Sequence, residues 1–137
     1  MNLDAHGGRT LRILIVDDDR FAADTARALL ELAGHTVAVA YSGVEGIELG
    51  KQTSPDVVLC DLFLADVVDG YAVARALRAD PTSRGALLIA ITGFAHSRDR
   101  DEAWEAGFDR FVSKPVDVTA LARTLQDPTS REPNLRQ

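Results

Sequence analysis

The sequence predicts an α/β domain, a three-layer sandwich in which helices cover both faces of a parallel sheet. Short apolar runs alternate with segments of helical periodicity five times along the chain. The runs are continuous in apolar residues, a pattern typical of strands that are buried on both faces of a parallel sheet. Parallel strands joined by helices require right-handed crossovers, which place the helices on both faces of that sheet.

Five apolar runs are predicted to form the strands. The first four are strongly apolar, whereas the fifth, which follows Gly107, is weaker. They cover residues 13–16, 37–40, 57–60, 87–91 and 110–113. Cys60 ends the third run and is the only cysteine. No intrachain disulfide can therefore form, and we expect a buried, unreactive thiol.

The first two helices are predicted between the first three runs. Residues 21–33 carry apolar side chains three or four positions apart, and Gly34 is a typical C-terminal stop. This apolar face consists of Ala22, Ala26, Leu29, Leu30 and Ala33. The second helix begins at Ser42-Gly43-Val44-Glu45, which has the form of a capping box, in which the hydroxyl and the carboxylate bind free backbone N–H groups.

Three further helices follow. Residues 69–79 form the third, which ends before a turn at Asp80-Pro81. Its apolar positions are Val73, Ala76 and Leu77. The fourth covers residues 97–106 and is closed by the glycine that precedes the fifth run, and Asp117 is the expected N-cap of a fifth that runs to about Leu125.

The length and composition of the chain indicate one globular domain. The chain has 137 residues, of which 46% are hydrophobic and 26% charged, as in ordinary soluble proteins. We expect the domain to span residues 11–126, with flexible tails at residues 1–10 and 127–137. A second domain such as a DNA-binding unit does not fit in the final segment, so we expect either a free-standing protein or a piece of a larger one.

Charge and hydropathy exclude several classes of function. The formal net charge is −6, which argues against direct binding of nucleic acid, because such binding needs clustered Lys and Arg. No apolar stretch approaches the roughly 20 residues that span a bilayer, and the first ten residues lack a signal-like apolar region. We therefore expect a cytoplasmic protein with no membrane partner. The negative net charge is compatible with a site that holds a cation.

Polar side chains stand at the ends of four predicted strands. Asp17-Asp18-Asp19 follows the first strand, Asp61 the third, Thr92 the fourth, and Lys114-Pro115 the fifth. Because the carboxyl ends of parallel strands lie at one edge of an open sheet, where ligands bind, we expect these side chains to converge.

Each of these residues also has a plainer explanation. Acidic residues after a strand are common N-caps, Thr92 alone is an ordinary β-branched strand residue, and a lone Lys114 is usually solvated. Carboxylates that converge repel one another, however, unless they share a cation. Oxygen ligands suit a hard ion, Mg²⁺ or Mn²⁺, and the ammonium of Lys114 can pair with Asp61 and later with a phosphoryl oxygen.

Together these residues resemble the receiver domains of two-component response regulators, the CheY-like superfamily. The match runs from about Arg12 to Leu125 and includes Gly70 and the turn Ala106-Gly107-Phe108-Asp109. The resemblance implies a flavodoxin-like (βα)5 fold with strand order 2-1-3-4-5. It also implies a phosphoacceptor that is not an enzyme, and whose phosphoryl group comes from a histidine kinase, a histidine phosphotransfer protein or a small acyl phosphate.

The same resemblance implies a role for each site residue. Asp61 accepts the phosphoryl group and contacts the metal, Asp18 is a direct metal ligand, and Asp17 acts on the metal mainly through water. Phe63 lends its backbone carbonyl to the ion. Catalysis involves Asp61, Thr92 and Lys114, and the switch consists of Thr92 and Phe111, whose ring moves inward and reshapes a face that binds a downstream protein.

Some positions depart from the family pattern. The loop over residues 62–69 is one residue longer than usual and has Ala65 where proline is frequent. Within it, Val67-Val68 either contacts a partner or packs under the third helix. Phe63 and Phe94 stand two residues after Asp61 and Thr92, and we hypothesise that their rings exclude water and slow hydrolysis of the phosphoryl group.

Two further aromatic residues, Phe111 and Trp104, bear on the switch and on the partner face. Phe111 lacks the hydroxyl of a tyrosine, so switching has to rest on packing. Trp104 either belongs to the partner face or has a purely structural role.

Two other functions remain open from the residues. One is a receiver-like interaction module that works without phosphorylation. The other is a hydrolase with Asp17 as nucleophile and Asp19 as acid, which the order of the loops and the lack of a capping insertion disfavour.

Overall fold

The computed structural model describes residues 10–93 and 97–125, which form a five-stranded parallel sheet and five helices. The strands are β1 (Arg12–Val16), β2 (Thr36–Ala40), β3 (Val57–Asp61), β4 (Leu87–Thr92) and β5 (Arg110–Ser113). The helices are α1 (Arg20–Leu32), α2 (Gly43–Thr53), α3 (Gly70–Ala79), α4 (Ser97–Ala106) and α5 (Val118–Thr124). The strand order β2-β1-β3-β4-β5 confirms the predicted topology.

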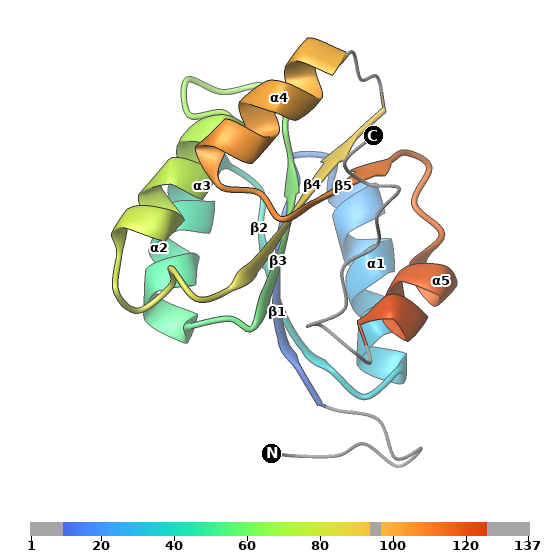
Figure 1. The fold of residues 1–137 in the computed structure, drawn as a ribbon. Coiled ribbons are helices and arrows are strands. Elements are labelled where there is room, and N and C mark those ends of the chain that lie inside the picture. The colour runs from blue at the N-terminus through green and yellow to red at the C-terminus, as the bar shows by residue number, and fades with distance from the viewer. Residues whose placement is uncertain (1–9, 94–96, 126–137) are drawn as a thin grey trace.

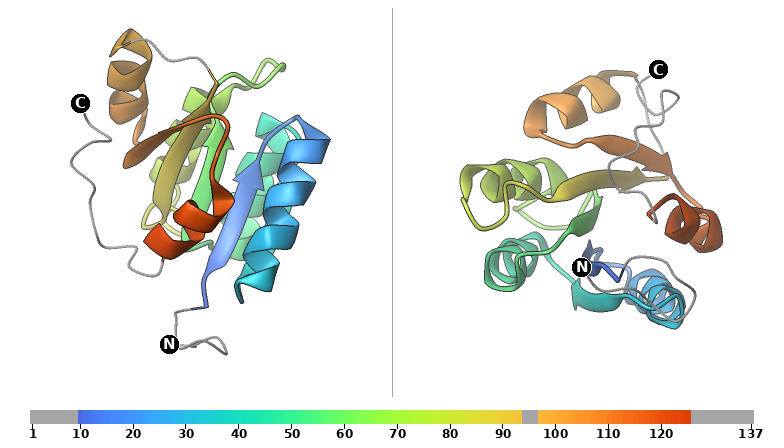
Figure 2. Two further views of the ribbon diagram at one scale, coloured as in Figure 1. Left: turned by 90° about the vertical axis from the view of Figure 1, so that its right-hand side faces the viewer. Right: turned by 60° about the horizontal axis from the view of Figure 1, so that its bottom comes forward.

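The domain has three layers. Helices α2, α3 and α4 cover one face of the sheet, and α1 and α5 cover the other (Figure 1). The two further views in Figure 2 show the sheet twisting between these helical layers. The flavodoxin-like three-layer sandwich is therefore confirmed.

Two apolar clusters, one on each face of the sheet, form the core. Neighbouring residues of a strand point to opposite faces, so Leu14 belongs to the cluster under α2, α3 and α4, and Ile13 and Ile15 belong to the cluster under α1 and α5. Burial of one such side chain stabilises the fold by roughly 1.5–3 kcal/mol. This double burial explains why the strands are continuous in apolar residues.

Aspartate and serine side chains define the starts of the helices. Asp19, Asp69 and Asp117 each accept a hydrogen bond from a backbone N–H in the first turn of α1, α3 and α5. Ser42 Oγ accepts from the N–H of Glu45 at 3.2 Å, and the Glu45 carboxylate accepts from the N–H of Tyr41 at 2.7 Å. The predicted capping box is thus present, with its carboxylate bound one residue ahead of the N-cap.

The structure corrects several details of the sequence prediction. Helix α1 begins at Arg20, because Asp19 caps it, and its buried residues are Ala23 and Leu30. Leu29, predicted on the buried face, is 42% exposed. Asp61 and Thr92 are the last residues of their strands and do not follow them.

The ends of the domain are only partly described. The expected tails at residues 1–10 and 127–137 lie almost entirely outside the described residues, so their flexibility stays a prediction. None of the helices described is long and apolar enough to cross a membrane.

Candidate functional site

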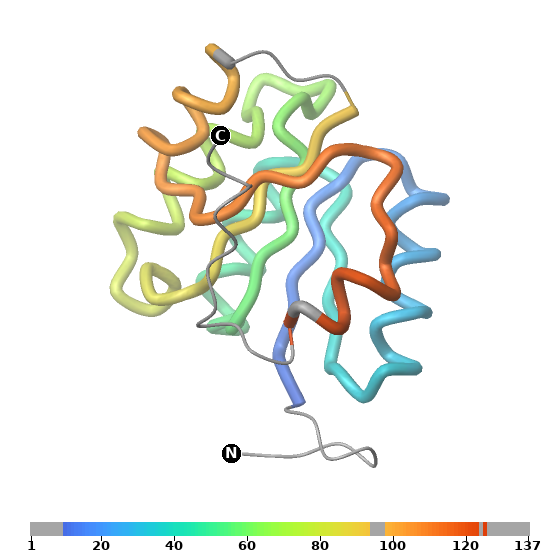
Figure 3. Tube along the Cα trace, turned by 45° about the vertical axis from the view of Figure 1, so that its right-hand side comes forward, coloured from blue at the N-terminus to red at the C-terminus, as the bar shows by residue number. Residues whose placement is uncertain are grey.

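Three carboxylates meet where β1 and β3 end. Val16 of β1 lies beside Cys60 of β3, so the next residues along the two strands, Asp17 and Asp61, become neighbours. One oxygen from each of Asp17, Asp18 and Asp61 lies within 4.8 Å of the others. Asp17 and Asp61 are each 8% exposed, and Asp18 is exposed. Figure 3 shows the loops after β1, β3 and β5 gathered at the upper edge of the sheet.

Lys114 brings a positive charge to this cluster from the end of β5. Its Nζ lies 3.1 Å from Asp61 Oδ2 and 3.5 Å from Asp17 Oδ2. Its backbone N–H donates to the carbonyl of Thr92 at 2.8 Å, and the peptide bond to Pro115 is cis. The predicted convergence of a hydroxyl-bearing strand end, an ammonium and two acidic loops is therefore present.

The charges at this site perturb one another. Burial lowers the pKa of Lys114, but the hydrogen bond to Asp61 and the charges of Asp61 and Asp17 outweigh it and raise that pKa above its usual value. Burial raises the pKa of Asp17, and the Asp61 charge adds to this, against the opposing hydrogen bond from Asp19 and the charge of Lys114. Burial is therefore the main cause of the raised pKa of Asp17.

Backbone N–H groups orient the three carboxylates. Asp17 Oδ1 accepts from the N–H of Asp19 at 2.9 Å, and Asp61 Oδ1 accepts from that of Phe63 at 3.1 Å. Asp18 Oδ2 accepts from the N–H of Ala65 at 2.7 Å. Within the described part of the chain, Asp18 Oδ1 has no such donor, so it is the oxygen best placed to ligate a cation.

A small hard cation fits this set of donors. Mg²⁺ binds oxygen ligands at about 2.1 Å, so two ligands on one ion lie at most about 4.2 Å apart. The carboxylate oxygens are close to that spacing, and their net charge with Lys114 is still negative. A shift of a few tenths of an ångström would let Asp18 and Asp61 share one ion, with water completing its shell.

The two residues predicted to form the switch lie on adjacent strands. Thr92 ends β4 at 1% exposure, and its partner in register is Ser113 of β5. Phe111 of β5 is 3% exposed, so its ring already lies inside the domain. The guanidinium of Arg100 from α4 lies over that ring, 5.4 Å from its centroid. Burial of Phe111 is thus coupled to a contact with α4.

The loop that follows Asp61 presents one apolar ring beside the carboxylates. The Phe63 side chain is 51% exposed and packs edge-on against Tyr71 of α3, with ring centroids 6.3 Å apart. Val68 packs against the core, as the second alternative predicted, whereas Val67 is 97% exposed and its contact with a partner stays a prediction. Phe94 lies outside the described residues, and its role stays a hypothesis.

Other site features were expected only in part. Cys60 is fully buried as expected, and burial, followed by the Asp61 charge, raises the pKa of its thiol.

Trp104 is partly buried and packs against the core, which favours the structural role. A Cβ on Gly70 would collide with the carbonyl oxygen of Asp61, so this glycine lets α3 approach the loop that follows Asp61. The contact of Asp18 with Ala65 was missed, because a backbone donor leaves no signal in the sequence.

An apolar groove adjoins the site. It has a volume of about 480 Å³ and lies between α1 and the segment from Lys114 to α5. Asp17 and Lys114 stand at its rim, together with Phe21, which is 82% exposed. Of the three clustered carboxylates, that of Asp17 therefore borders this groove.

Comparisons with known proteins agree with this geometry. Residues 13–126 match the model of a family described as the response regulator receiver domain. The chain is 30% identical over 117 residues to the polar-differentiation response regulator DivK of Brucella ovis. The matched residues make up 85% of this chain and 94% of that protein. It is 35% identical over 125 residues to the DNA-binding dual master transcriptional regulator RpaA of a Synechocystis strain. The matched residues make up 89% of this chain but only 52% of that protein, so the chain spans about half of its length.

Solved structures show the same likeness. The receiver domain of the sensor histidine kinase PA1611 from Pseudomonas aeruginosa superimposes with a TM-score of 0.78 at 29% identity, covering 89% of this chain and 100% of that one. That crystal structure has a magnesium ion coordinated in the active site cleft. A response regulator receiver domain protein from Methanospirillum hungatei gives a TM-score of 0.77 at 28% identity, covering 87% and 93% of the two chains.

Proposed function

This chain belongs to the response regulator receiver domain family, and from that membership we propose that Asp61 is the residue that accepts the phosphoryl group. As a receiver domain the chain is a component of two-component signalling. Support for Asp61 comes from its position at the end of the central strand β3, where Lys114 Nζ and the oxygens of Asp17 and Asp18 surround it.

The transfer follows from the charges at the site. A carboxylate oxygen of Asp61 forms a bond to phosphorus while the bond from phosphorus to the donor atom breaks, and the leaving group keeps the electron pair. Lys114 lies close enough to Asp61 to neutralise charge on a phosphoryl oxygen, which is most of what phosphoryl transfer requires of a protein. The N–H of Phe63 holds the other carboxylate oxygen and so fixes the angle of attack.

The donor set supports Mg²⁺, or Mn²⁺, as the resident ion. Asp18 and Asp61 would ligate it directly, Asp17 would act through water, and the carbonyl of Phe63 would complete the protein ligands. When bound, the ion supplies positive charge to the transferring phosphoryl group. The magnesium ion in the cleft of the PA1611 receiver domain supports this choice.

One partner protein donates the phosphoryl group, and another binds the phosphorylated chain. Receiver domains are generally signalling modules without an enzymatic function of their own, and we assign the same character to this chain. The donor is a histidine kinase or a histidine phosphotransfer protein, and the apolar groove beside Lys114 supports a protein donor. A downstream protein binds the face of α4, β5 and α5, which changes when Thr92 contacts the phosphoryl group and Phe111 repacks. With such partners, the proposed location of the chain is the cytoplasm.

Mass spectrometry of the intact chain tests the acceptor. Incubation with acetyl phosphate and Mg²⁺ is expected to add one phosphoryl group to the wild type and to Asp101→Asn, a control on the exposed side of α4. Asp61→Asn is expected to remain unmodified. An unmodified wild type would favour the interaction module that works without phosphorylation, and turnover through Asp17 would favour the hydrolase.

A further inference from the structure

The backbone and the ring of Phe63 contact different parts of the domain. Its N–H donates to Asp61 Oδ1 at 3.1 Å, and its ring packs edge-on against Tyr71 of α3. The position of this backbone therefore depends on the Asp61 carboxylate. A displacement of the backbone carries the ring with it and changes the contact with α3, because close-packed side chains transmit shifts rather than absorb them.

Tyr71 connects this ring contact to α4. The side chain is 7% exposed, and its hydroxyl donates to the backbone carbonyl of Asp99 at 3.4 Å. Because the pKa of Tyr71 is raised, by burial above all, to about 12, the hydroxyl keeps its proton at neutral pH and remains a donor. The usual O–H···O distance is about 2.8 Å, so this bond has room to shorten when either side moves.

The first turn of α4 also contacts the aromatic residue that is predicted to switch. Arg100 follows Asp99 directly, and its guanidinium lies 5.4 Å from the centroid of the Phe111 ring. Phe111 belongs to β5 and is buried in the core cluster under α4. Two series of contacts therefore meet at consecutive residues of α4, one through Tyr71 and the other through Phe111.

We propose that Tyr71 couples the phosphoryl site to α4 by a route that is separate from Thr92 and Phe111. This inference rests on the proposed role of Asp61 as the acceptor. An acyl phosphate no longer shares a negative charge between its two carboxyl oxygens, so the charge-assisted hydrogen bond to the N–H of Phe63 weakens. The Phe63 backbone then shifts, its ring moves against Tyr71, and the hydroxyl changes its contact with the start of α4.

Amide chemical shifts of α4 test this coupling. The probe is BeF₃⁻ with Mg²⁺, because tetrahedral beryllium binds a carboxylate oxygen as phosphorus does but is not hydrolysed away. Tyr71→Phe keeps the ring and removes the hydroxyl, whereas the control Tyr41→Phe removes a hydroxyl that binds Asp24. The probe is expected to shift the amides of residues 99–103 in the wild type and in the control, and by less than about half as much in Tyr71→Phe. Phosphoryl incorporation from acetyl phosphate should be equal in all three chains.

Combined variants distinguish one route from two. Phe63→Leu interrupts the same route one step earlier, so it should reduce the α4 shifts as Tyr71→Phe does, and the two together should reduce them no further. Thr92→Ala interrupts the other route. Part of the α4 response should therefore remain in Thr92→Ala and disappear when Tyr71→Phe is added.

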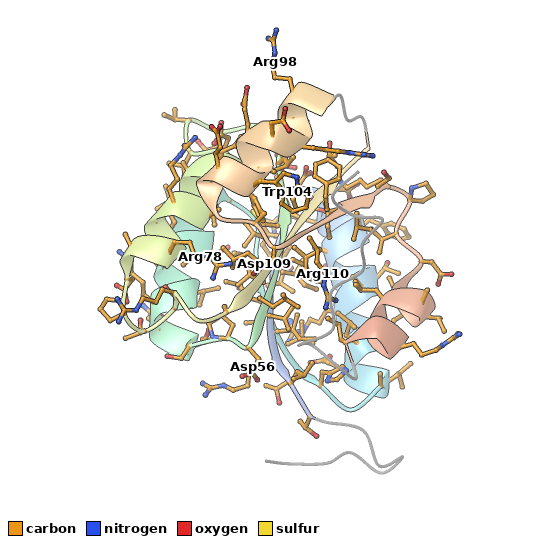
Figure 4. The ribbon with its side chains drawn as sticks, viewed as in Figure 1. Asp56, Arg78, Arg98, Trp104, Asp109 and Arg110 are labelled. Carbon is orange, nitrogen blue, oxygen red and sulfur yellow. The ribbon has the colours of Figure 1, made fainter. Side chains whose placement is uncertain are left out.

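Trp104 provides a second measurement of the same response. It is the only tryptophan of the chain, lies one turn after Arg100 and packs against the core. Figure 4 shows its side chain between α4 and the sheet, and that of Arg98 pointing away from the domain. The change in Trp104 fluorescence on addition of the probe should decrease in Tyr71→Phe and stay at the wild-type value in Arg98→Met.

The outcomes separate the coupling from the proposed function. An α4 response of equal size in Tyr71→Phe and Tyr41→Phe would overturn the coupling and leave Asp61 as the acceptor. The same holds for a wild type in which the probe shifts the Phe63 amide but not α4. A wild type that neither shifts at Phe63 nor takes up a phosphoryl group would overturn the proposed function, and the coupling with it.

Discussion

The carboxylate of Asp18 accepts a hydrogen bond of 2.7 Å from the backbone N–H of Ala65, 47 residues further along the chain. This bond joins the loop after β1 to the loop that follows Asp61. Asp18, which is best placed to ligate a cation, therefore also holds the loop that follows Asp61. We therefore expect binding of a metal ion and the conformation of that loop to be coupled through the Asp18 side chain.

Asp18 variants separate these two roles. We expect Asp18→Ala to weaken Mg²⁺ binding by at least about tenfold and to expose the Ala65 amide to hydrogen exchange. Asp18→Asn loses the negative charge but keeps an oxygen that accepts from Ala65, so it is expected to weaken Mg²⁺ binding and leave the amide protected. Calorimetric Mg²⁺ titration and exchange measured by NMR check both effects. An unprotected amide in both variants would contradict the separation.

Lys114→Met is expected to have opposite effects on metal binding and on phosphorylation. The ammonium shares Asp61 and Asp17 with any bound cation, so its removal should tighten Mg²⁺ binding. Phosphorylation by acetyl phosphate should slow by more than about tenfold, because a positive charge near the transferring group is lost. Rates at saturating Mg²⁺ provide the measurement, with Lys51→Met as a distant lysine control. A variant that loses both properties would indicate a damaged site.

Phe63→Asn is expected to shorten the lifetime of the phosphorylated chain. The ring lies half exposed next to Asp61, and we expect it to keep water from the phosphoryl group. A polar amide should accelerate decay by roughly two- to tenfold, which corresponds to a barrier lower by up to about 1.4 kcal/mol. Decay followed by mass spectrometry after removal of the donor is the measurement. Val67→Asn, at the exposed tip of the same loop, serves as control and should decay like the wild type.

Arg78→Met is expected to destabilise the fold by about 2–3 kcal/mol. Its partly buried guanidinium binds Asp109 and the carbonyls of Arg84, Ala86 and Gly107. Its removal takes this donor from all four acceptors and leaves Asp109 with the N–H of Leu88. Arg27→Ala breaks an exposed pair within α1 and should change stability by no more than about 0.5 kcal/mol. Urea unfolding measures both changes, and equal losses would contradict this account.

Tyr71 is expected to make stability depend on pH in the alkaline range. Burial, followed by the charges of Asp99 and Glu102, raises the pKa of Tyr71 to about 12. The folded state therefore holds this proton more tightly than the unfolded state, so the contribution is complete below pH 10 and is lost as pH rises toward 12. The difference in unfolding free energy between wild type and Tyr71→Phe should be constant up to pH 10 and then change. A constant difference up to pH 12 would contradict the shifted pKa.

Local features of the chain determined most of the fold and the identity of the site residues. Continuous apolar runs predicted all five strands within one residue at each end, because double burial requires apolar residues at every position. Polar residues at the ends of these runs indicated the site, since parallel strands carry their carboxyl ends to one edge. The capping residues Ser42 and Asp117 marked helix starts because their hydrogen bonds lie within one turn.

Only the tertiary structure decided contacts between distant segments. Periodicity placed both Leu29 and Leu30 on the buried face of α1. Leu30 is buried as predicted, but Leu29 is 42% exposed and Ala23, which was not predicted, is buried. The division of Val67 and Val68 between solvent and core, and the bond from Asp18 to Ala65, depend on how a loop closes over its neighbours. Nor did the strand pattern indicate that Arg110 is buried without a partner among the described residues. Sequence periodicity reports which residues can share a face, whereas the packing of helices and loops determines what covers that face.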